Sequence, residues 1–360
     1  MAMKLTDYLE KCVHMDATDI FIQAGSPVFA KINGEVQAVD DERLSPRDAA
    51  RIISEMYDIA GGSSGTRERD QLEDRGNDDF SFGIPELARF RANAYHQRGT
   101  VGAVIRVVNY DIPDYKEINI IDSVMDLCSA RAGLIVVCGP TGTGKTTTQA
   151  CMIDHINHTR NGHIITIEDP IEFIHRNDKC LITQCEVPID AKDVNTALYA
   201  AMRQTPDVVL LGEMRDFETI HAAVSAAETG HLIITTLHSP NAVTALSRII
   251  NSFPESQKSQ IRYLASMVLR AIVSQRLLPC TDGKLRPVFE VMKNTPDMQQ
   301  LILDDNAAGI NDLIASQADG MVSLDSSIFK LYQDGHITDE TAKLFASNIE
   351  AMEQRIHGGT

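Results

Sequence analysis

The stretch that decides the fold runs from Leu134 to Thr147 and reads Leu-Ile-Val-Val-Cys-Gly-Pro-Thr-Gly-Thr-Gly-Lys-Thr-Thr. Its first five residues are apolar and rich in β-branched side chains, which predicts a buried strand. The glycines after them allow a tight turn in which successive backbone N–H groups face one centre. A helix-prone run from Gln149 to Ile156 follows, and the N-terminal dipole of that helix favours a bound anion.

The pattern Gly-x-x-x-x-Gly-Lys-Thr inside this stretch indicates a phosphate-binding loop. In such a loop Lys145 reaches the β and γ phosphates, and the hydroxyl of Thr146 is placed for Mg²⁺. An ordinary glycine-rich loop is the alternative, but the flanking strand and helix disfavour it. ATP and Mg²⁺ are therefore the expected ligands. The residues expected to bind the nucleotide are Gly139, Pro140, Thr141, Gly142, Thr143, Gly144, Lys145, Thr146 and Thr147.

Composition limits the remaining choices. The 360 residues suffice for two domains. The net charge of −17 opposes nonspecific binding to nucleic acid or to an anionic membrane surface. Seven dispersed cysteines fit reduced cytosolic thiols rather than a disulfide framework. No signal-peptide core is found, and no apolar run approaches the roughly 18 residues of a transmembrane helix. We therefore expect a soluble, cytoplasmic protein.

Residues 1–110 predict a small α+β domain. Asn33-Gly34 between two short apolar runs is a strong signal for a hairpin turn, and the glycine- and serine-rich residues 61–65 predict a plain surface loop. Later segments alternate polar and apolar residues with a period of two, as half-buried strands do. The expected helices are 5–15 and 46–57, and the expected strands are 19–22, 29–32, 36–39, 79–82, 89–95 and 101–108.

A linker is expected at residues 111–120, followed by an ATPase core at 121–293 and a helical region at 294–360. The core begins with a predicted helix at 121–130, and its apolar strands alternate with helices, which predicts an α/β fold with a parallel sheet covered on both faces. Those strands are 134–138, 164–167, 208–211 and 232–237. Helical spacing of apolar residues predicts a helix over 257–275 and a last helix from about 338 to 356.

Acidic residues follow two of the core strands. The strand at 164–167 leads into Glu168, and ligands of open α/β sheets bind where strands end. A carboxylate there can deprotonate the attacking water, so Glu168 is the predicted general base; an acidic turn that caps a helix is the alternative. The strand at 208–211 leads into Glu213, which is predicted to support Mg²⁺ through water.

Histidines flank the strand at 232–237. His238 at its end, with His231 at its start, is predicted to hydrogen-bond the γ phosphate and so report hydrolysis. The alternative is a satisfied polar group. A second pair, His155 and His158 with Asp154, has a spacing that could bind a metal, but an exposed polar face is favoured because cysteine partners are missing.

Taken together, these motifs resemble the secretion ATPases of the type II/type IV pilus superfamily. The four signatures of that family are the Walker A loop, the Asp box, the Walker B box and the His box. They match Gly139–Thr146, Thr166–Glu172, Arg203–Asp216 and Thr229–Asn241. The resemblance covers nearly the whole chain. It implies a RecA-like core with a parallel sheet, preceded by a PAS-like α+β domain and followed by C-terminal helices.

The first domain also matches the family. Asp16–Ile22 resembles the start of its PAS-like domain, and Arg89–Asn93 resembles its Arg-Phe-Arg strand. In the family, arginines of this domain close on the γ phosphate, and the matching positions are Arg91 and Arg106, with Arg89 less certain. A planar guanidinium is suited to the charge that develops on a transferred phosphoryl group. Salt bridges at the rim of a β-sheet are the alternative.

Within the superfamily the chain is similar to pilus retraction ATPases of the PilT and PilU type. Its first domain begins almost at Met1, and it lacks the tetracysteine insertion usual in assembly and type II secretion motors. The residues after Pro296 depart from the PilT pattern, whereas Arg248–Glu255 and Arg270–Leu277 are closer to the PilU pattern. The resemblance implies a homohexamer that acts at the inner face of the membrane on a platform protein of the pilus machine. A paralogous retraction ATPase is a further expected partner.

Other functions remain open at this stage. A type II secretion or pilus assembly ATPase shares the same core. A nucleic-acid motor is disfavoured by the acidic charge and by the lack of an aromatic and basic stripe. A ring subunit that binds nucleotide without hydrolysing it is disfavoured because every expected catalytic position is filled.

Overall fold

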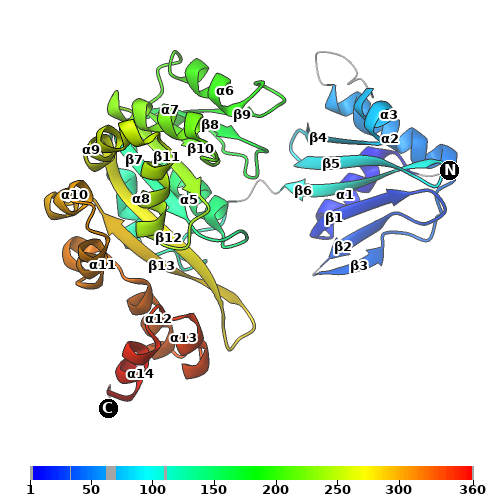
Figure 1. Ribbon diagram of the computed structural model, residues 1–360. Coiled ribbons are helices and arrows are strands. Elements are labelled where there is room, and N and C mark those ends of the chain that lie inside the picture. Colours follow the sequence, from blue (N-terminus) through cyan, green and yellow to red (C-terminus); the bar gives the residue numbers. More distant parts are fainter. Residues whose placement is uncertain (1–2, 33, 62–69, 109–111, 359–360) are drawn as a thin grey trace. The chain divides into compact units, whose positions relative to one another are not determined.

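The computed structural model describes residues 3–32, 34–61, 70–108 and 112–358 (Figure 1). The chain forms two compact units, Met1–Asp111 with Glu172–Ile174, and Ile112–Ile171 with His175–Thr360. Three predicted features fall partly outside the described residues: Asn33 of the hairpin turn, residues 62–65 of the surface loop, and Asp111 of the linker.

The first unit is an antiparallel six-stranded sheet with helices on one face. Its strand order is β3-β2-β1-β6-β5-β4. Period-two patterning buries one face, where Phe82 and Phe90 stack with ring centroids 5.3 Å apart and Tyr57 of α2 packs on Phe80. The elements are α1 (Leu5–His14), β1 (Ala17–Gln23), β2 (Phe29–Ile32), β3 (Glu35–Ala38), α2 (Pro46–Ala60), α3 (Asp70–Arg75), β4 (Asn77–Ile84), β5 (Ala88–Gln97) and β6 (Thr100–Val108).

The start of α2 shows how local sequence sets a helix boundary. Ser45 accepts a hydrogen bond from the backbone N–H of Asp48, and the Asp48 carboxylate accepts one from the N–H of Ser45. Pro46 occupies the first helical position, where its missing N–H costs nothing. The apolar stripe of α2 then faces the sheet, so this unit combines helices with an antiparallel sheet.

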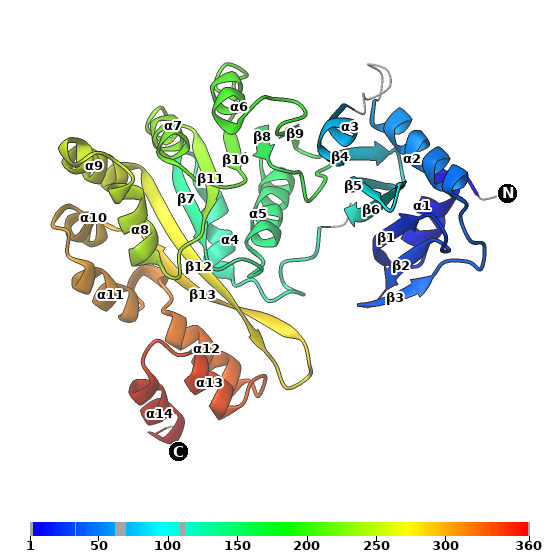
Figure 2. The ribbon, with the colours of Figure 1, turned by 45° about the vertical axis from the view of Figure 1, so that its right-hand side comes forward.

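The second unit contains a seven-stranded sheet of order β13-β12-β7-β11-β10-β8-β9, parallel except for the β12–β13 pair (Figure 2). One face packs on α4 and α5 and the other on α6 to α9. The predicted parallel core is confirmed. Its elements are α4 (Asp122–Met125), β7 (Gly133–Cys138), α5 (Lys145–Thr159), β8 (Gly162–Glu168), β9 (Cys180–Glu186), α6 (Val194–Ala201), β10 (Val208–Leu211), α7 (Phe217–Glu228), β11 (Leu232–Leu237), α8 (Ala242–Asn251), α9 (Lys258–Val268), β12 (Leu269–Pro279) and β13 (Leu285–Lys293).

The helix predicted over 257–275 is wrong in its second half. Helix α9 ends at Val268, and β12 begins at Leu269. Residues 271–274 pair in parallel with 135–138 of β7, and 271–279 pair with β13. The partners on β7 are distant in sequence, whereas β13 follows β12 in a hairpin. Sheet pairing on both edges of β12 thus overrides the helical spacing of its apolar residues. The predicted helix at 121–130 is also shorter, because α4 gives way to a 3₁₀ turn at Asp126–Ser129.

The C-terminal region is helical, as predicted, with α10 (Pro296–Leu303), α11 (Ala307–Ala315), α12 (Leu324–Gln333), α13 (Asp339–Phe345) and α14 (Ile349–Gly358). The single last helix predicted over 338–356 is two helices. The carboxylate of Asp325 accepts hydrogen bonds from the backbone N–H groups of Ser347 and Asn348 and fixes the break. Side chains of α12 to α14 pack on the far end of the β12–β13 hairpin in one apolar cluster. Throughout the described ranges, no helix has both the length and the apolar character needed to span a bilayer.

Candidate active site

The loop after β7 has a backbone that only glycine accommodates. Gly139, Gly142 and Gly144 have φ angles of 153°, 79° and 83°, and Gly144 precedes the first residue of α5. A Cβ atom on Gly139 would lie 2.3 Å from the carbonyl oxygen of Gln275, so no side chain fits there. The loop therefore turns directly against the neighbouring strand β12.

Lys145 is the first residue of α5, and its side chain reaches back to the start of the loop. Its Nζ donates hydrogen bonds to the carbonyl oxygens of Gly139, at 3.0 Å, and Pro140, at 2.8 Å. The residue is 8% exposed, and burial lowers the pKa of its ammonium. Thr143 Oγ1 also donates to Pro140, at 3.0 Å. The loop thus holds a positive charge at its centre, where a phosphate needs it.

Two hydroxyls follow on the first turn of α5, those of Thr146 and Thr147, both half-buried. Mg²⁺ in triphosphate sites takes one or two protein oxygens and fills its shell with phosphate oxygens and water. The hydroxyl of Thr146 and the carboxylate of Glu213 are oxygens of that kind. The residues present therefore fit Mg²⁺ bound together with phosphate, rather than a metal site built by protein alone.

The acidic strand ends meet at one edge of the sheet. Ile167 of β8 and Thr235 of β11 both pair with Leu211 of β10, so these strands end together. Glu168 is 6% exposed. A Cβ atom on Gly212 would lie 3.5 Å from the Cα of Glu168, which shows how closely the two strand ends approach.

Glu213 links the end of β10 to the end of β11. Its Oε2 lies 2.9 Å from Nε2 of His238, and its Oε1 forms an ion pair with Nε of Arg215. Burial, together with the charges of Lys145, Arg248 and Arg215, lowers the pKa of His238. At neutral pH the imidazole is therefore neutral, and its N–H can donate to the Glu213 carboxylate.

A surface pocket of about 350 Å³ opens between the phosphate loop and the segment after β11. Its lining residues are Pro140, Thr141, His238, Ser239 and Pro240. Ser239 is buried, and its Oγ has no hydrogen-bond partner in the described part of the chain. The pocket thus joins the predicted nucleotide loop to the predicted histidine within one unit.

His231 does not belong to this group, and the prediction that it contacts the γ phosphate is wrong for a nucleotide on its own chain. Leu232 pairs with Gly133 at the start of β7, whereas Leu237 pairs with Cys138 just before the loop. His231 therefore lies at the opposite edge of the sheet, roughly 20 Å away along the strand. Its Nδ1 lies 3.2 Å from the Ala226 carbonyl oxygen and 3.2 Å from Thr229 Oγ1.

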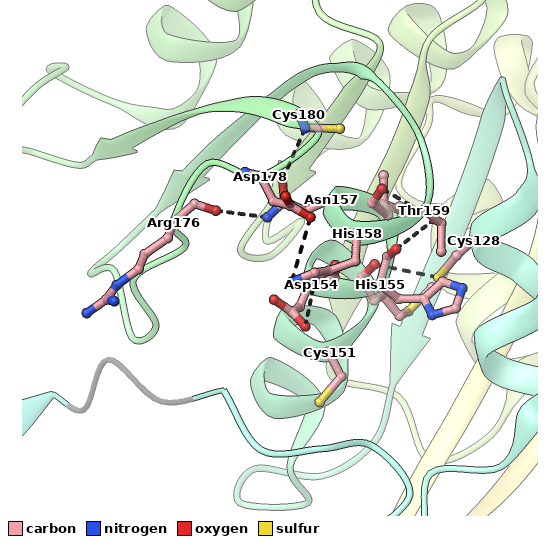
Figure 3. Close-up of polar contacts among 12 residues, drawn as sticks. Cys128, Cys151, Asp154, His155, Asn157, His158, Thr159, Arg176, Asp178 and Cys180 are labelled. Atoms are coloured by element: carbon pink, nitrogen blue, oxygen red, sulfur yellow. Dashed lines mark hydrogen bonds and ion pairs between the residues drawn. The ribbon is translucent and has the colours of Figure 1, made fainter.

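The two histidines on α5 contact neighbouring side chains of their own unit (Figure 3). Nδ1 of His158 lies 3.4 Å from the carboxylate of Asp154, and Nε2 lies 3.9 Å from that of Asp178. The ring of His155 meets Tyr115 edge-on. Across the described ranges, no cluster of three or more His, Cys, Asp or Glu side chains is arranged to hold a metal ion.

The two predicted arginines lie together in the first unit. Arg91 on β5 pairs directly with Arg106 on β6, and Arg106 pairs with Asp19 on β1. Both arginine side chains are exposed, and Nε of Arg106 lies 3.0 Å from a carboxylate oxygen of Asp19. Arg89 is half-buried two residues earlier. The exposed sheet face of the first unit therefore presents two adjacent guanidinium groups.

Sequence reasoning missed Gln275. Its side chain is 3% exposed and contacts the first turn of α5. The prediction of a helix over this segment hid its position on the strand beside the loop. The available signal was a polar Ser-Gln-Arg run, residues 274–276, inside an otherwise apolar segment.

The chain is similar to known proteins over most of its length. The family described as "Type II/IV secretion system protein" matches residues 71–340, most of the chain. This chain belongs to the type II/IV secretion system protein family. Membership confirms the predicted P-loop ATPase and the α/β fold class with its helical C-terminus.

Members of the family are similar over nearly the full length. The type IV pilus retraction ATPase PilT of Pseudomonas aeruginosa is 36% identical, over 95% of this chain and 97% of that protein. The type IV pilus ATPase PilU of the same organism is 37% identical, over 99% and 92%. A crystal structure of the pilus retraction motor PilT with bound ADP superimposes with a TM-score of 0.89 at 38% identity, covering 98% of this chain and 100% of that one.

His175, in the loop that follows the Asp box, is a buried histidine with a strongly shifted pKa. Its backbone N–H donates to Gln184 Oε1 at 2.9 Å, and the residue is 8% exposed. Burial lowers its pKa from 6.5 to about 4. The folded protein therefore takes up the proton at lower pH than the unfolded chain does.

This shift predicts a loss of stability in mild acid. Above pH 6.5 the imidazole is neutral in both states, and as the pH falls toward 4 only the unfolded chain gains the proton. The free energy of unfolding falls by up to about 3 kcal/mol across that window. Substituting His175→Gln should flatten the dependence of the urea midpoint between pH 6.5 and 4. The exposed His221→Gln, as control, should keep the wild-type slope; equal slopes in all three proteins would contradict the assignment.

Proposed function

We propose that this chain hydrolyses ATP with Mg²⁺ and, as a homohexameric ring, drives the retraction of type IV pili. The observation that carries the proposal is one site: a buried lysine inside a glycine turn, next to aligned acidic strand ends. Similarity over almost the whole chain to proteins described as pilus retraction motors supports pilus retraction as the process that ATP hydrolysis drives.

The phosphate loop supplies binding. Backbone N–H groups of Gly139–Thr146 and the N-terminus of α5 attract the phosphates. Lys145 Nζ already lies within hydrogen-bond distance of two loop carbonyls, so a phosphate oxygen can replace them with little movement of the side chain. Thr146 would hold the metal, with Glu213 supporting it through water. When bound, Mg²⁺ neutralises charge on the transferred phosphoryl group.

The acidic strand ends supply the chemistry. Glu168, buried at the end of β8, is the proposed general base that takes a proton from the attacking water. His238 is proposed to sense the γ phosphate, because it lines the pocket beside the loop and touches Glu213. Loss of the γ phosphate would then change the contact of His238 with Glu213 and, through it, the Glu213–Arg215 ion pair. Glu168 is 6% exposed, and its burial strengthens the electrostatic contacts of its carboxylate.

Two substitutions separate binding from turnover. Lys145→Ala should lose both ATP binding and hydrolysis, because no other cation lies in the loop's centre among the described residues. Glu168→Gln keeps the shape but not the base, so it should bind ATP normally and hydrolyse it at least 100-fold more slowly. Fluorescent-nucleotide titration and phosphate release measure the two effects, with the exposed Glu255→Gln as control. Wild-type turnover in Glu168→Gln would remove the residue from its role.

The arginines of the first unit are proposed to act on the γ phosphate during closure of that unit. Their adjacency on an exposed sheet face supports this proposal, since two guanidinium groups together can meet an oxyanion. Arg91→Ala should lower kcat by roughly 10³-fold while ATP affinity stays close to wild type. The matched control is Arg98→Ala, in the turn after β5. An unchanged kcat in Arg91→Ala would reduce these arginines to surface charges.

Retraction itself is tested in cells. We propose that the ring works on an inner-membrane platform protein of the pilus machine, alone or beside a paralogous retraction ATPase. The nearly equal identities to PilT and PilU favour neither arrangement. Deleting the gene should abolish or reduce twitching motility with pili still assembled, and wild type but not Glu168→Gln should restore it. Loss of surface pili in the deletion strain would point instead to an assembly motor.

A further inference from the structure

The strand next to the phosphate loop carries three consecutive polar residues after the apolar run at 271–273. Ser274, Gln275 and Arg276 lie on β12, between β7 and β13. Ser274 pairs with Cys138, the last residue of β7. The chain therefore leaves β7 and enters the loop directly beside Gln275.

Gln275 contacts the loop at both of its ends. Its backbone carbonyl oxygen occupies the space where a side chain on Gly139 would lie. Its side-chain Nε2 would be 3.1 Å from a Cβ atom on Gly144, the last residue before α5. The Oε1 atom accepts a hydrogen bond of 2.7 Å from Oγ1 of Thr148 in the first turn of that helix. One residue thus spans the whole turn from strand to helix.

The two neighbours of Gln275 reach the other wall of the pocket. Ser274 Oγ donates to the carbonyl oxygen of Pro240 at 3.1 Å, and an Arg276 guanidinium nitrogen donates to the same oxygen at 3.4 Å. Side chains alternate along a strand, so Ser274 and Arg276 point to one face and Gln275 to the other. Strand β12 therefore ties the phosphate loop on one face and the His238–Pro240 segment on the other.

Burial makes the choice of glutamine informative. Packing alone would be served by methionine or leucine, because a buried amide costs free energy unless its polar atoms are paired. The side-chain oxygen Oε1 of Gln275 accepts a hydrogen bond from Thr148, and its side-chain nitrogen Nε2 lies next to Gly144. Both ends of the amide are therefore directed at the two segments that bind phosphate.

We propose that Gln275 is a positioning residue for ATP hydrolysis, and that its side-chain amide holds the phosphate loop and the first turn of α5 in the geometry that binds the β and γ phosphates. This inference rests on the proposed assignment of Gly139–Thr146 as the phosphate site. Gln275 acts through the loop and does not itself touch the nucleotide.

A double-mutant cycle tests the hydrogen bond that carries the proposal. Gln275→Met keeps the volume and removes both polar atoms, and Thr148→Val removes the donor. Each should raise the KM for ATP about fivefold to tenfold, the loss expected for one buried hydrogen bond, with a smaller change in kcat. Because both changes break the same bond, the double variant should be no worse than the single ones.

Controls separate positioning from plain stability. Gln300→Met, the same substitution at an exposed glutamine of α10 whose amide donates to Asp304 just after that helix, should leave KM unchanged. Thermal melts without nucleotide report folding, while melts with ATP should show a smaller ligand-induced shift for Gln275→Met than for wild type. If Gln275→Met fails to fold, Thr148→Val alone still carries the test.

The outcomes distinguish this inference from the function on which it rests. Wild-type KM in Gln275→Met and Thr148→Val, with ATP binding lost in Lys145→Ala, would overturn the role of Gln275 and leave the phosphate site intact. ATP binding retained in Lys145→Ala would overturn the site itself. Strictly additive effects of the two variants would show that the residues act separately, which also contradicts the proposal.

Discussion

The close approach of Gly139 to the carbonyl oxygen of Gln275 is the constraint on which the rest of the structure depends. A side chain at position 139 would collide with backbone, and backbone of a central strand cannot move aside without breaking sheet hydrogen bonds on both of its edges. The turn into the phosphate loop is therefore set by two strands at once. The loop inherits the rigidity of the sheet, which is what a preorganised anion site requires.

From that turn the other groups of the site follow by topology. Parallel strands bring their carboxyl ends to the same edge, so Glu168, Glu213 and His238 meet although they come from three separate strands. The buried ammonium of Lys145 is held by the loop carbonyls of Gly139 and Pro140, in a chain whose overall charge is −17. Specific binding of a polyanion thus depends on a small buried cation and aligned backbone dipoles, because the surface as a whole repels it.

The antiparallel hairpin of β12 and β13 gives the core a rigid connection between two ends of the second unit. Near the loop it contacts Gly139 and Pro240. At its far end Leu278 and Val288 lie in an apolar cluster with Leu324 and Ile328 of α12. A strand pair is stiff along its length, so the C-terminal helices and the nucleotide loop are attached to one common element.

The sequence by itself determined what local pattern can encode: the glycine turn, the strand and helix around it, the acidic residues at strand ends, and the alternating strands of the first unit. Tertiary structure decided the rest. His231 and His238 belong to one motif, yet a strand between them carries them to opposite edges of the sheet. The segment around Gln275 has apolar spacing that fits a helix, and its partner Thr148 lies 127 residues away in sequence. Pairing of β12 with β7 joins segments far apart in sequence. Which segment lies beside the phosphate loop is therefore decided only when the sheet forms.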